Sequence, residues 1–241
     1  MSDDFLIGKD GDVSTITINR PNEGNRVSDE MAIELTGILT DVSRDSRLIV
    51  FRGAGDNFCL GRAVMGSRGP LPEAYDAREK NDLVFNLYGA FRDAPVPVIG
   101  VIQGRATGLG CALAASCDIT IAEHSSEFQA PEMSHNIMPT MLMSSLIDRM
   151  TMKGLLYLIY STKAISAEQA MAFGIVSEVA PTDFLDVVLV ELLVKLKAMP
   201  VPALKAVKEY AQNAMNLDAQ GAANYARNLH ATLNTSSKLR G

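Results

Sequence analysis

The chain has 241 residues, of which 47% are hydrophobic and 21% are charged, and this composition is typical of a globular protein with a sizeable core. Its 28 acidic and 22 basic residues give a formal net charge of −6, which argues against a general nucleic-acid or anionic-membrane surface. Three cysteines without CxxC or paired Cys/His spacing indicate neither a disulfide framework nor a metal site. The acidic N-terminus lacks the features of a secretory signal, and no apolar run reaches the length of a membrane span, so we expect a cytoplasmic protein.

The first predicted elements form a strand, a helix and a second strand. Residues Val13 to Ile18 and Leu48 to Phe51 are rich in β-branched side chains, and apolar residues recur at helical spacing from Ser28 to Val42. Ser28 and the two acidic residues after it favour a helix start, because a hydroxyl caps the free N–H groups and carboxylates complement the helix dipole. The unit therefore predicts the βαβ pattern of an α/β fold.

A second strand–helix unit is separated from the first by a polar stretch. A helix is expected over residues 76–92, and the uninterrupted apolar run from Val96 to Ile102 predicts a strand that is buried on both faces. The glycine-containing segment from Gly104 to Gly110 predicts a turn after this strand. An apolar helix is expected next, from Cys111 to Ser116, and another strand from Ile119 to Ala122. The order of strand, glycine turn and helix is a ligand-binding layout.

The rest of the chain is predicted to be helical, with neither a linker nor an internal repeat. The expected helices are Met141 to Met152, Leu155 to Ser161, Ala167 to Phe173, Phe184 to Met199 and Ala203 to Leu233. We therefore expect one continuous domain, in which residues 1–184 form the core and residues 185–241 form a helical region.

Two glycine-containing turns are the first candidates for chemistry: FCLGRAVMG from Phe58 to Gly66, and GRATGLGCALAASCD from Gly104 to Asp118. Glycine lets the backbone approach a ligand and turn N–H groups toward it, and a helix start favours negative charge. A plain tight turn is the alternative for each of them. A dinucleotide fingerprint is not favoured, because Leu113 occupies the place of its third small residue.

Several segments resemble the crotonase (enoyl-CoA hydratase/isomerase) superfamily in order and spacing. They are ITINRP with NEGNRVSDEM, FCLGRAVMG, PVPVIGVIQGRATGLGCALAASCDITIA, FQAPEMSHNIMP and AISAEQAMAFGIVSEVAP. The resemblance implies an α/β fold, the crotonase-type spiral of ββα units with a C-terminal helical region that helps to form a homotrimer or homohexamer. It also implies an acyl-CoA substrate, a coenzyme A thioester, with no permanently bound cofactor.

Carried over to this sequence, the resemblance implies that the backbone N–H groups of Arg62 and Leu109 form an oxyanion hole. Leu109 stands where the family has a glycine, so its side chain is expected either to narrow the acyl pocket or to need an unusual dihedral. Of the two carboxylates that hydratases place around a water, one falls on Glu132 and the other falls on Ala112. Thr140 to Met143 replace the family's glycine cluster and are expected to crowd the water site.

A single base fits isomerisation better than hydration, because a double-bond shift needs one group that removes and returns a proton. The resemblance therefore implies an enoyl-CoA isomerase with Glu132 as its base. A Met-rich pocket is expected to raise the pKa of Glu132. A solvent-facing loop carboxylate is the alternative for Glu132, and His135 is a candidate second acid or base that is otherwise a plain surface residue.

The coenzyme A side is assigned to Arg26, Arg62, Ala63, Gly108 and Gly110, again from the resemblance. Lys205 and Lys208 are further candidates for phosphate contacts, although each such residue is more often solvated. Asp118 is expected to make a structural hydrogen bond. The cysteines Cys59, Cys111 and Cys117 have apolar flanks, which indicate buried, inert thiols.

Two other functions stay open from the sequence. One is an enoyl-CoA hydratase or an acyl-CoA hydrolase or lyase that uses Glu132 with His135. The other is a crotonase-fold protein that has lost catalysis and only binds a ligand or partner, which the alanine at 112 and the altered residues 140–143 would explain.

Overall fold

The computed structural model describes residues 2–63 and 73–239, in which a six-stranded main sheet forms the centre. Its strands in spatial order are β1 (Phe5–Asp10), β2 (Val13–Ile18), β3 (Leu48–Gly53), β4 (Val98–Ile102), β6 (Ile119–Glu123) and β9 (Glu178–Ala180). β1 and β2 pair as an antiparallel hairpin, and every later pair in this sheet is parallel. The predicted βαβ start is therefore confirmed by the parallel pairing of β2 with β3.

A three-stranded second sheet contains β5 (Arg105–Thr107), β7 (Glu127–Gln129) and β8 (Ile165–Ser166). β5 follows β4 almost directly, and β7 follows β6 in the same way, so the chain passes from a strand of the main sheet to one of the small sheet before α3 and again before α4. This repeated ββα progression is the crotonase-type spiral that the sequence resemblance implied.

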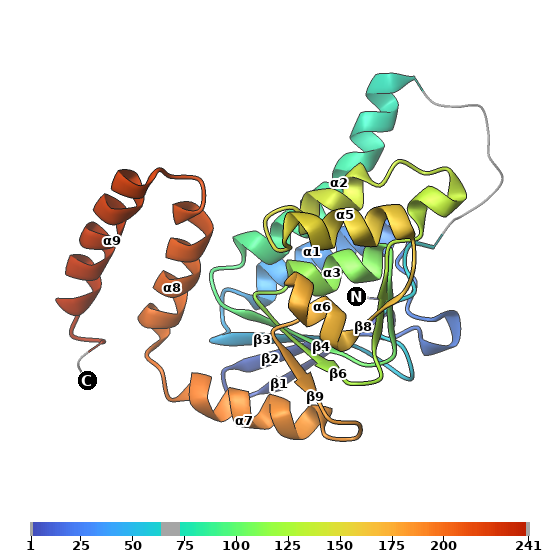
Figure 1. Cartoon of the computed structure of the whole chain (residues 1–241). Coiled ribbons are helices and arrows are strands. Elements are labelled where there is room, and N and C mark those ends of the chain that lie inside the picture. Colours follow the sequence, from blue (N-terminus) through green and yellow to red (C-terminus); the bar gives the residue numbers. More distant parts are fainter. Residues whose placement is uncertain (1, 64–72, 240–241) are drawn as a thin grey trace.

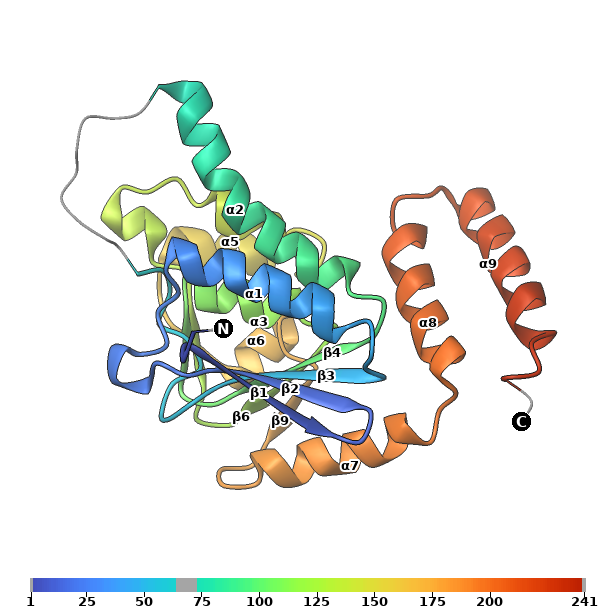
Figure 2. The ribbon, with the colours of Figure 1, turned by 180° about the vertical axis from the view of Figure 1, so that it is seen from behind.

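Helices cover both faces of the main sheet (Figure 1). Their bounds are α1 (Asp29–Val42), α2 (Ala74–Asp93), α3 (Leu109–Ser116), α4 (Thr140–Leu146), α5 (Met152–Ser161), α6 (Ala167–Phe173), α7 (Leu185–Lys197), α8 (Val201–Ala214) and α9 (Ala219–Asn234), with short 3-10 helices η1 (Pro21–Glu23) and η2 (Glu132–His135). Helices α1, α2 and α3 lie on one face and α7 lies on the other, while α8 and α9 form a hairpin beside the core (Figure 2).

Strands β3 and β4 are buried on both faces, as the continuous apolar run predicted for β4. Ile49 and Phe51 point into the cluster under α1, α2 and α3, whereas Leu48 and Val50 point into the cluster that Leu189 of α7 completes. Alternation along the strand thus divides the core into two layers. The division at residue 184 stays a prediction, although α7 packs as part of the second layer.

Two expectations about elements are wrong, and strand β1 was missed. The helix expected over Ala203 to Leu233 is two helices, because Asp218 caps a new start by accepting the N–H of Gly221 at 2.7 Å. The helix expected over Met141 to Met152 ends after Leu146, and α5 begins with its own cap at Thr151. Strand β1 was not expected from the sequence, because only Phe5 among its residues is buried.

Lys208 fixes α8 to the core. Its Nζ donates to the carbonyl oxygens of Phe91 and Val96 at 2.9 and 3.1 Å and lies 2.7 Å from Oδ2 of Asp118. The same carboxylate accepts the N–H of Val98 at 2.8 Å, which confirms the structural role expected for Asp118. Because the Lys208 ammonium is buried among these acceptors, it is not free for the phosphate contact considered from the sequence.

In residues 2–63 and 73–239, no helix is long and apolar enough to cross a membrane.

Candidate active site

The two glycine-containing turns lie directly against each other. Cys59 and Ala106 form a parallel bridge, in which the N–H of Cys59 donates to the carbonyl oxygen of Arg105 at 3.1 Å and the N–H of Thr107 donates to that of Cys59 at 2.9 Å. A side chain at Gly110 would collide with the carbonyl oxygen of Cys59. Only glycine at 110 therefore allows the start of α3 to come this close to the other turn.

The backbone N–H of Arg62 points away from its strand neighbour. Val27 pairs with this segment through two hydrogen bonds. Its N–H donates to the carbonyl oxygen of Gly61 at 3.0 Å, and its carbonyl oxygen accepts the N–H of Ala63 at 2.8 Å, so the N–H of Arg62 takes no part in the pairing. Within the described part of the chain, the Arg62 N–H meets no acceptor. It is thus free to donate to a bound group.

The N–H of Leu109 is also without an acceptor in the residues that the structure describes. Leu109 is the first residue of α3, where N–H groups have no partner inside the helix and the dipole favours negative charge. The preceding N–H, that of Gly108, donates to the carbonyl oxygen of Gln129 at 2.8 Å. The two N–H groups assigned by resemblance therefore lie on touching segments, and both are available.

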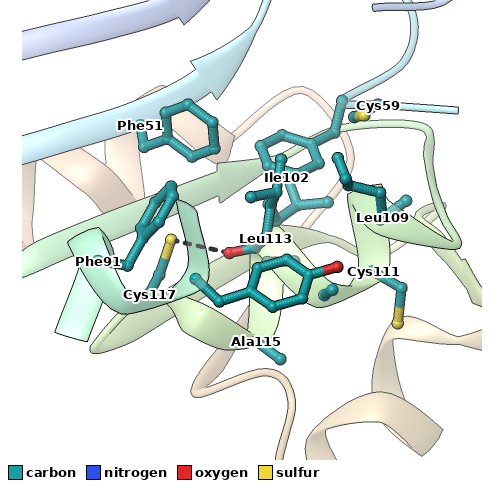
Figure 3. Packing of buried hydrophobic residues seen from close by; sticks show 14 of the residues in the cluster. Phe51, Cys59, Phe91, Ile102, Leu109, Cys111, Leu113, Ala115 and Cys117 are labelled. Carbon is teal, nitrogen blue, oxygen red and sulfur yellow. Dashed lines mark hydrogen bonds between the residues drawn. The ribbon is translucent and has the colours of Figure 1, made fainter. Parts of the chain in front are cut away.

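Leu109 causes no backbone strain, contrary to one of the two expectations for it. The unusual dihedrals fall on Gly108, with φ 54° and ψ −118°, while Leu109 is not among the residues with positive φ. Its side chain is only 7% exposed and belongs to the apolar cluster that contains Cys59 and Ile102 (Figure 3). The leucine is thus accommodated by packing.

Glu132 begins η2, and its carboxylate lies beside Gly108. A Cβ built on that glycine would be 3.0 Å from Oε1 of Glu132, and Oε2 is buried without a hydrogen-bond partner in the described residues. Burial raises the pKa of Glu132, against smaller lowering effects of its own backbone N–H and the charge of His135. This is the direction expected from the sequence and suits a base that must also release its proton.

His135 ends η2 and is exposed. Its positive charge acts on Glu132, so the two side chains are within electrostatic reach of each other. Among the described residues the His135 ring makes no hydrogen bond to the Glu132 carboxylate, so it neither orients nor neutralises that group directly.

The place of the second family carboxylate is apolar. Ala112 is fully buried in α3 within the main cluster. Met141 and Met143, at the start of α4, are half-buried and pack against the same cluster, where the family has small glycines. The structure brings no second carboxylate to Glu132 from these positions.

The residues assigned to coenzyme A differ in how far contacts within the chain already engage them. Arg26 is exposed, and its Nη1 donates to the carbonyl oxygen of Leu60 at 2.6 Å. The guanidinium of Arg62 pairs with Asp29 at the start of α1, with 3.0 Å between Nε and Oδ1, so its charge is largely compensated. Ala63 is held to Val27 by its backbone, and Lys205 is half-buried in α8.

All three thiols are buried, as expected. Loss of solvation raises the pKa of both Cys59 and Cys111 to about 12, and it raises that of Cys117 as well. At neutral pH these groups are protonated and unreactive.

Tyr88 is a mostly buried polar residue, within electrostatic reach of Glu132, that sequence reasoning did not single out. It lies on α2, is 8% exposed, and shares the main cluster with Leu109 and Cys111. Its position four residues after Val84 puts it on the apolar face of the predicted helix, which was the only signal available. Burial raises the pKa of the Tyr88 phenol, and the negative charge of Glu132 raises it further.

Comparison with known proteins identifies the family. The family model for enoyl-CoA hydratase/isomerase matches residues 8–241. The chain belongs to the enoyl-CoA hydratase/isomerase family. It is 32% identical to the 1,2-epoxyphenylacetyl-CoA isomerase of Escherichia coli over 209 residues, which are 82% of this chain and 77% of that protein. It is 26% identical over 216 residues to the short-chain-enoyl-CoA hydratase of Clostridium acetobutylicum, covering 88% of this chain and 82% of the relative.

The fold is shared with solved structures of the family. The crystal structure of an enoyl-CoA hydratase from Mycobacterium smegmatis matches with a TM-score of 0.92 at 23% identity, covering 98% of this chain and 93% of that one. The relatives are enzymes of the crotonase superfamily, and this family member is an enzyme of the same kind.

Proposed function

We propose that this family member is an enoyl-CoA isomerase that shifts a double bond with Glu132 as its only base. The observation that carries the proposal is the Glu132 carboxylate, which is half-buried beside Gly108 with its Oε2 unpartnered in the described residues, while Ala112 occupies the place of a second carboxylate. The free N–H groups of Arg62 and Leu109 supply the donors for the thioester oxygen.

The reaction proceeds in two proton transfers. Glu132 takes a proton from Cα of a 3-enoyl thioester, and the electrons of that C–H bond move toward the thioester carbonyl, whose oxygen gains negative charge. Two backbone donors stabilise that charge, at about 3 kcal/mol for each donor in comparable oxyanion holes. Glu132 then returns the proton to Cγ, the double bond moves to Cα and Cβ, and no water is consumed.

Hydration is less well supported by the same site. Adding water across a double bond requires a water to be held and deprotonated while Cα is protonated, which two carboxylates do more readily than one. Here Met141 and Met143 of α4, which packs on α3, pack against the apolar cluster that contains Ala112. His135 is the remaining polar group for a hydratase, hydrolase or lyase reaction, but its ring is exposed.

We further propose that coenzyme A lies along Arg26, the backbone of Arg62 and Ala63, and the glycines Gly108 and Gly110. Arg26 is exposed and is already oriented by Leu60, so it can meet a phosphate without crossing the core. Arg62 contributes chiefly its backbone, because Asp29 compensates its side chain.

The experiment is to incubate the purified protein separately with a 3-enoyl-CoA and with crotonyl-CoA, and to identify the products by mass spectrometry. Isomerisation predicts a 2-enoyl product from the first and no 3-hydroxyacyl product from the second. The variant His135→Ala should retain the isomerase reaction. Rapid hydration of crotonyl-CoA that is lost in His135→Ala would contradict the proposal and favour the hydratase.

We also propose that α8 and α9 complete a homotrimer or homohexamer. No residue of α9, which the structure describes in full, is buried within the single chain. Light scattering should give a mass of three or six chains, and a monomer would contradict this proposal.

A further inference from the structure

The hydroxyl of Tyr88 has no hydrogen-bond partner among the described residues, although the residue as a whole is 8% exposed. Tyr88 is more than nine-tenths buried, yet its Oη makes no hydrogen bond to any residue within 2–63 or 73–239. Buried phenols usually have a partner. The more exposed tyrosines of the C-terminal hairpin do, since Tyr210 donates to Ala222 at 3.2 Å and Tyr225 donates to Glu209 at 2.6 Å.

Tyr88 packs into the core beside α3, where it also lines a pocket with Ser116 and Ser144. Helix α2 packs on α3, and Tyr88 lies in the same cluster as Leu109 and Cys111 at the start of α3. After burial, the charges that act on its phenol are those of Glu132, Cys111, Cys59 and Arg62, which come from η2, α3 and the turn before residue 63. The raised pKa of Tyr88 keeps its proton in place at working pH, so the group can only donate.

The proposed mechanism already gives hydrogen-bond or proton-transfer partners to the other reacting groups of the substrate. The thioester oxygen has two backbone donors, and Glu132 acts on the proton at Cα. Position 112 is a buried alanine and offers Tyr88 no acceptor. Among the described residues, the unpartnered Glu132 carboxylate is the other acceptor whose charge reaches Tyr88, so an oxygen atom on the acyl chain beyond Cα would compete with it for the hydroxyl.

We propose that Tyr88 is a further substrate-contacting residue, whose hydroxyl donates a hydrogen bond to an oxygen substituent of the acyl chain, so that the site prefers oxygenated acyl groups over plain hydrocarbon ones. The inference rests on the proposed acyl-CoA site and names its substrate class. A neutral hydrogen bond contributes about 1 kcal/mol net, which corresponds to roughly fivefold in affinity.

The test is a binding comparison in a background that cannot turn over the ligands. Calorimetry would measure butyryl-CoA and each enantiomer of 3-hydroxybutyryl-CoA against Glu132→Gln and against Glu132→Gln combined with Tyr88→Phe. We expect one enantiomer to bind Glu132→Gln about fivefold more tightly than butyryl-CoA does. In the double variant this preference should vanish, while butyryl-CoA affinity changes by less than about twofold.

Tyr160→Phe in the Glu132→Gln background is the matched control, because Tyr160 is 70% exposed on α5. It should keep the preference. The inference is overturned if neither enantiomer binds more tightly than butyryl-CoA, if the preference survives Tyr88→Phe, or if Tyr88→Phe weakens all ligands equally and lowers the melting temperature, which indicates a packing role. None of these outcomes concerns double-bond isomerisation, whose failure would be seen in the turnover assay instead.

Discussion

A methyl group on Gly108 would lie 3.0 Å from Oε1 of Glu132. The residue that precedes the free N–H of Leu109 is therefore also the residue that leaves room for the proposed base. The proposed oxyanion donor and the proposed base are thus both next to one glycine, whose φ of 54° is disfavoured for other residues.

Gly108→Ala should strongly reduce turnover for this reason. The new Cβ would push the Glu132 carboxylate by a few tenths of an ångström, and the dihedral at 108 costs about 1 to 3 kcal/mol for a non-glycine residue. We expect a loss of roughly 10-fold in kcat, since a misplacement of about 1 Å can cost 100-fold and this shift is smaller. Steady-state kinetics with a 3-enoyl-CoA would measure it.

Gly37→Ala is the control for that substitution. Gly37 is exposed in the middle of α1, and a Cβ there meets nothing within 4 Å. It should leave kcat unchanged and stabilise the fold by about 0.5 to 1 kcal/mol. Equal turnover of Gly108→Ala and wild type would show that this glycine does not position Glu132.

The pH dependence of stability should show that burying ionised Glu132 is unfavourable. Because the pKa of Glu132 is raised in the folded protein above its ordinary 4.5, folding binds a proton, and stability falls as pH rises from that value through the folded pKa. Glu132→Gln removes this effect. Its melting temperature should match wild type near pH 4 and exceed it increasingly toward pH 8.

Glu168→Gln should show the opposite trend. The N–H groups at the start of α6 and Ser166 lower the pKa of Glu168, so its ionised form stabilises the fold, and replacing it should cost stability that is fully present above about pH 4.5 and disappears as pH falls through the lowered folded pKa. A Glu132→Gln variant that behaves like Glu168→Gln would mean that the folded protein stabilises the ionised Glu132 carboxylate, which contradicts a raised pKa.

The buried strands and the first helix could be predicted because their signals are local. Strand β2 has the bounds expected from its β-branched run, and Ser28 caps α1 by accepting the N–H of Met31 at 3.2 Å. The cap at Asp218 is equally local but was hidden within a long helical pattern. Strand β1 depends on its pairing with β2, which local composition does not reveal.

The site could be predicted in part. The turns with Arg62, Leu109 and Glu132 were located from motifs, and the structure brings Glu132 beside Gly108. Tyr88 could not be found, because nothing near it in sequence distinguishes a core phenol from one that faces a ligand. Lys208 looked like a surface cation, and only the tertiary contact with Asp118 shows otherwise.

Lys208→Met should destabilise the protein strongly. It leaves Asp118 without its buried cation, and removing one partner of such a pair costs about 3 to 5 kcal/mol. Urea unfolding at neutral pH would measure the change, with Lys205→Met, on the same helix and half-buried, expected within about 0.5 kcal/mol of wild type. Equal effects of the two substitutions would show that Lys208 does not anchor α8.

The proton transfer assigned to Glu132 is tested most directly by measuring the isomerisation rate and the affinity for an unreactive acyl-CoA in Glu132→Gln. The glutamine keeps the shape of the side chain but cannot take a proton. The account predicts a fall in kcat of at least about 1,000-fold with affinity within about threefold of wild type. Turnover within tenfold of wild type would contradict it.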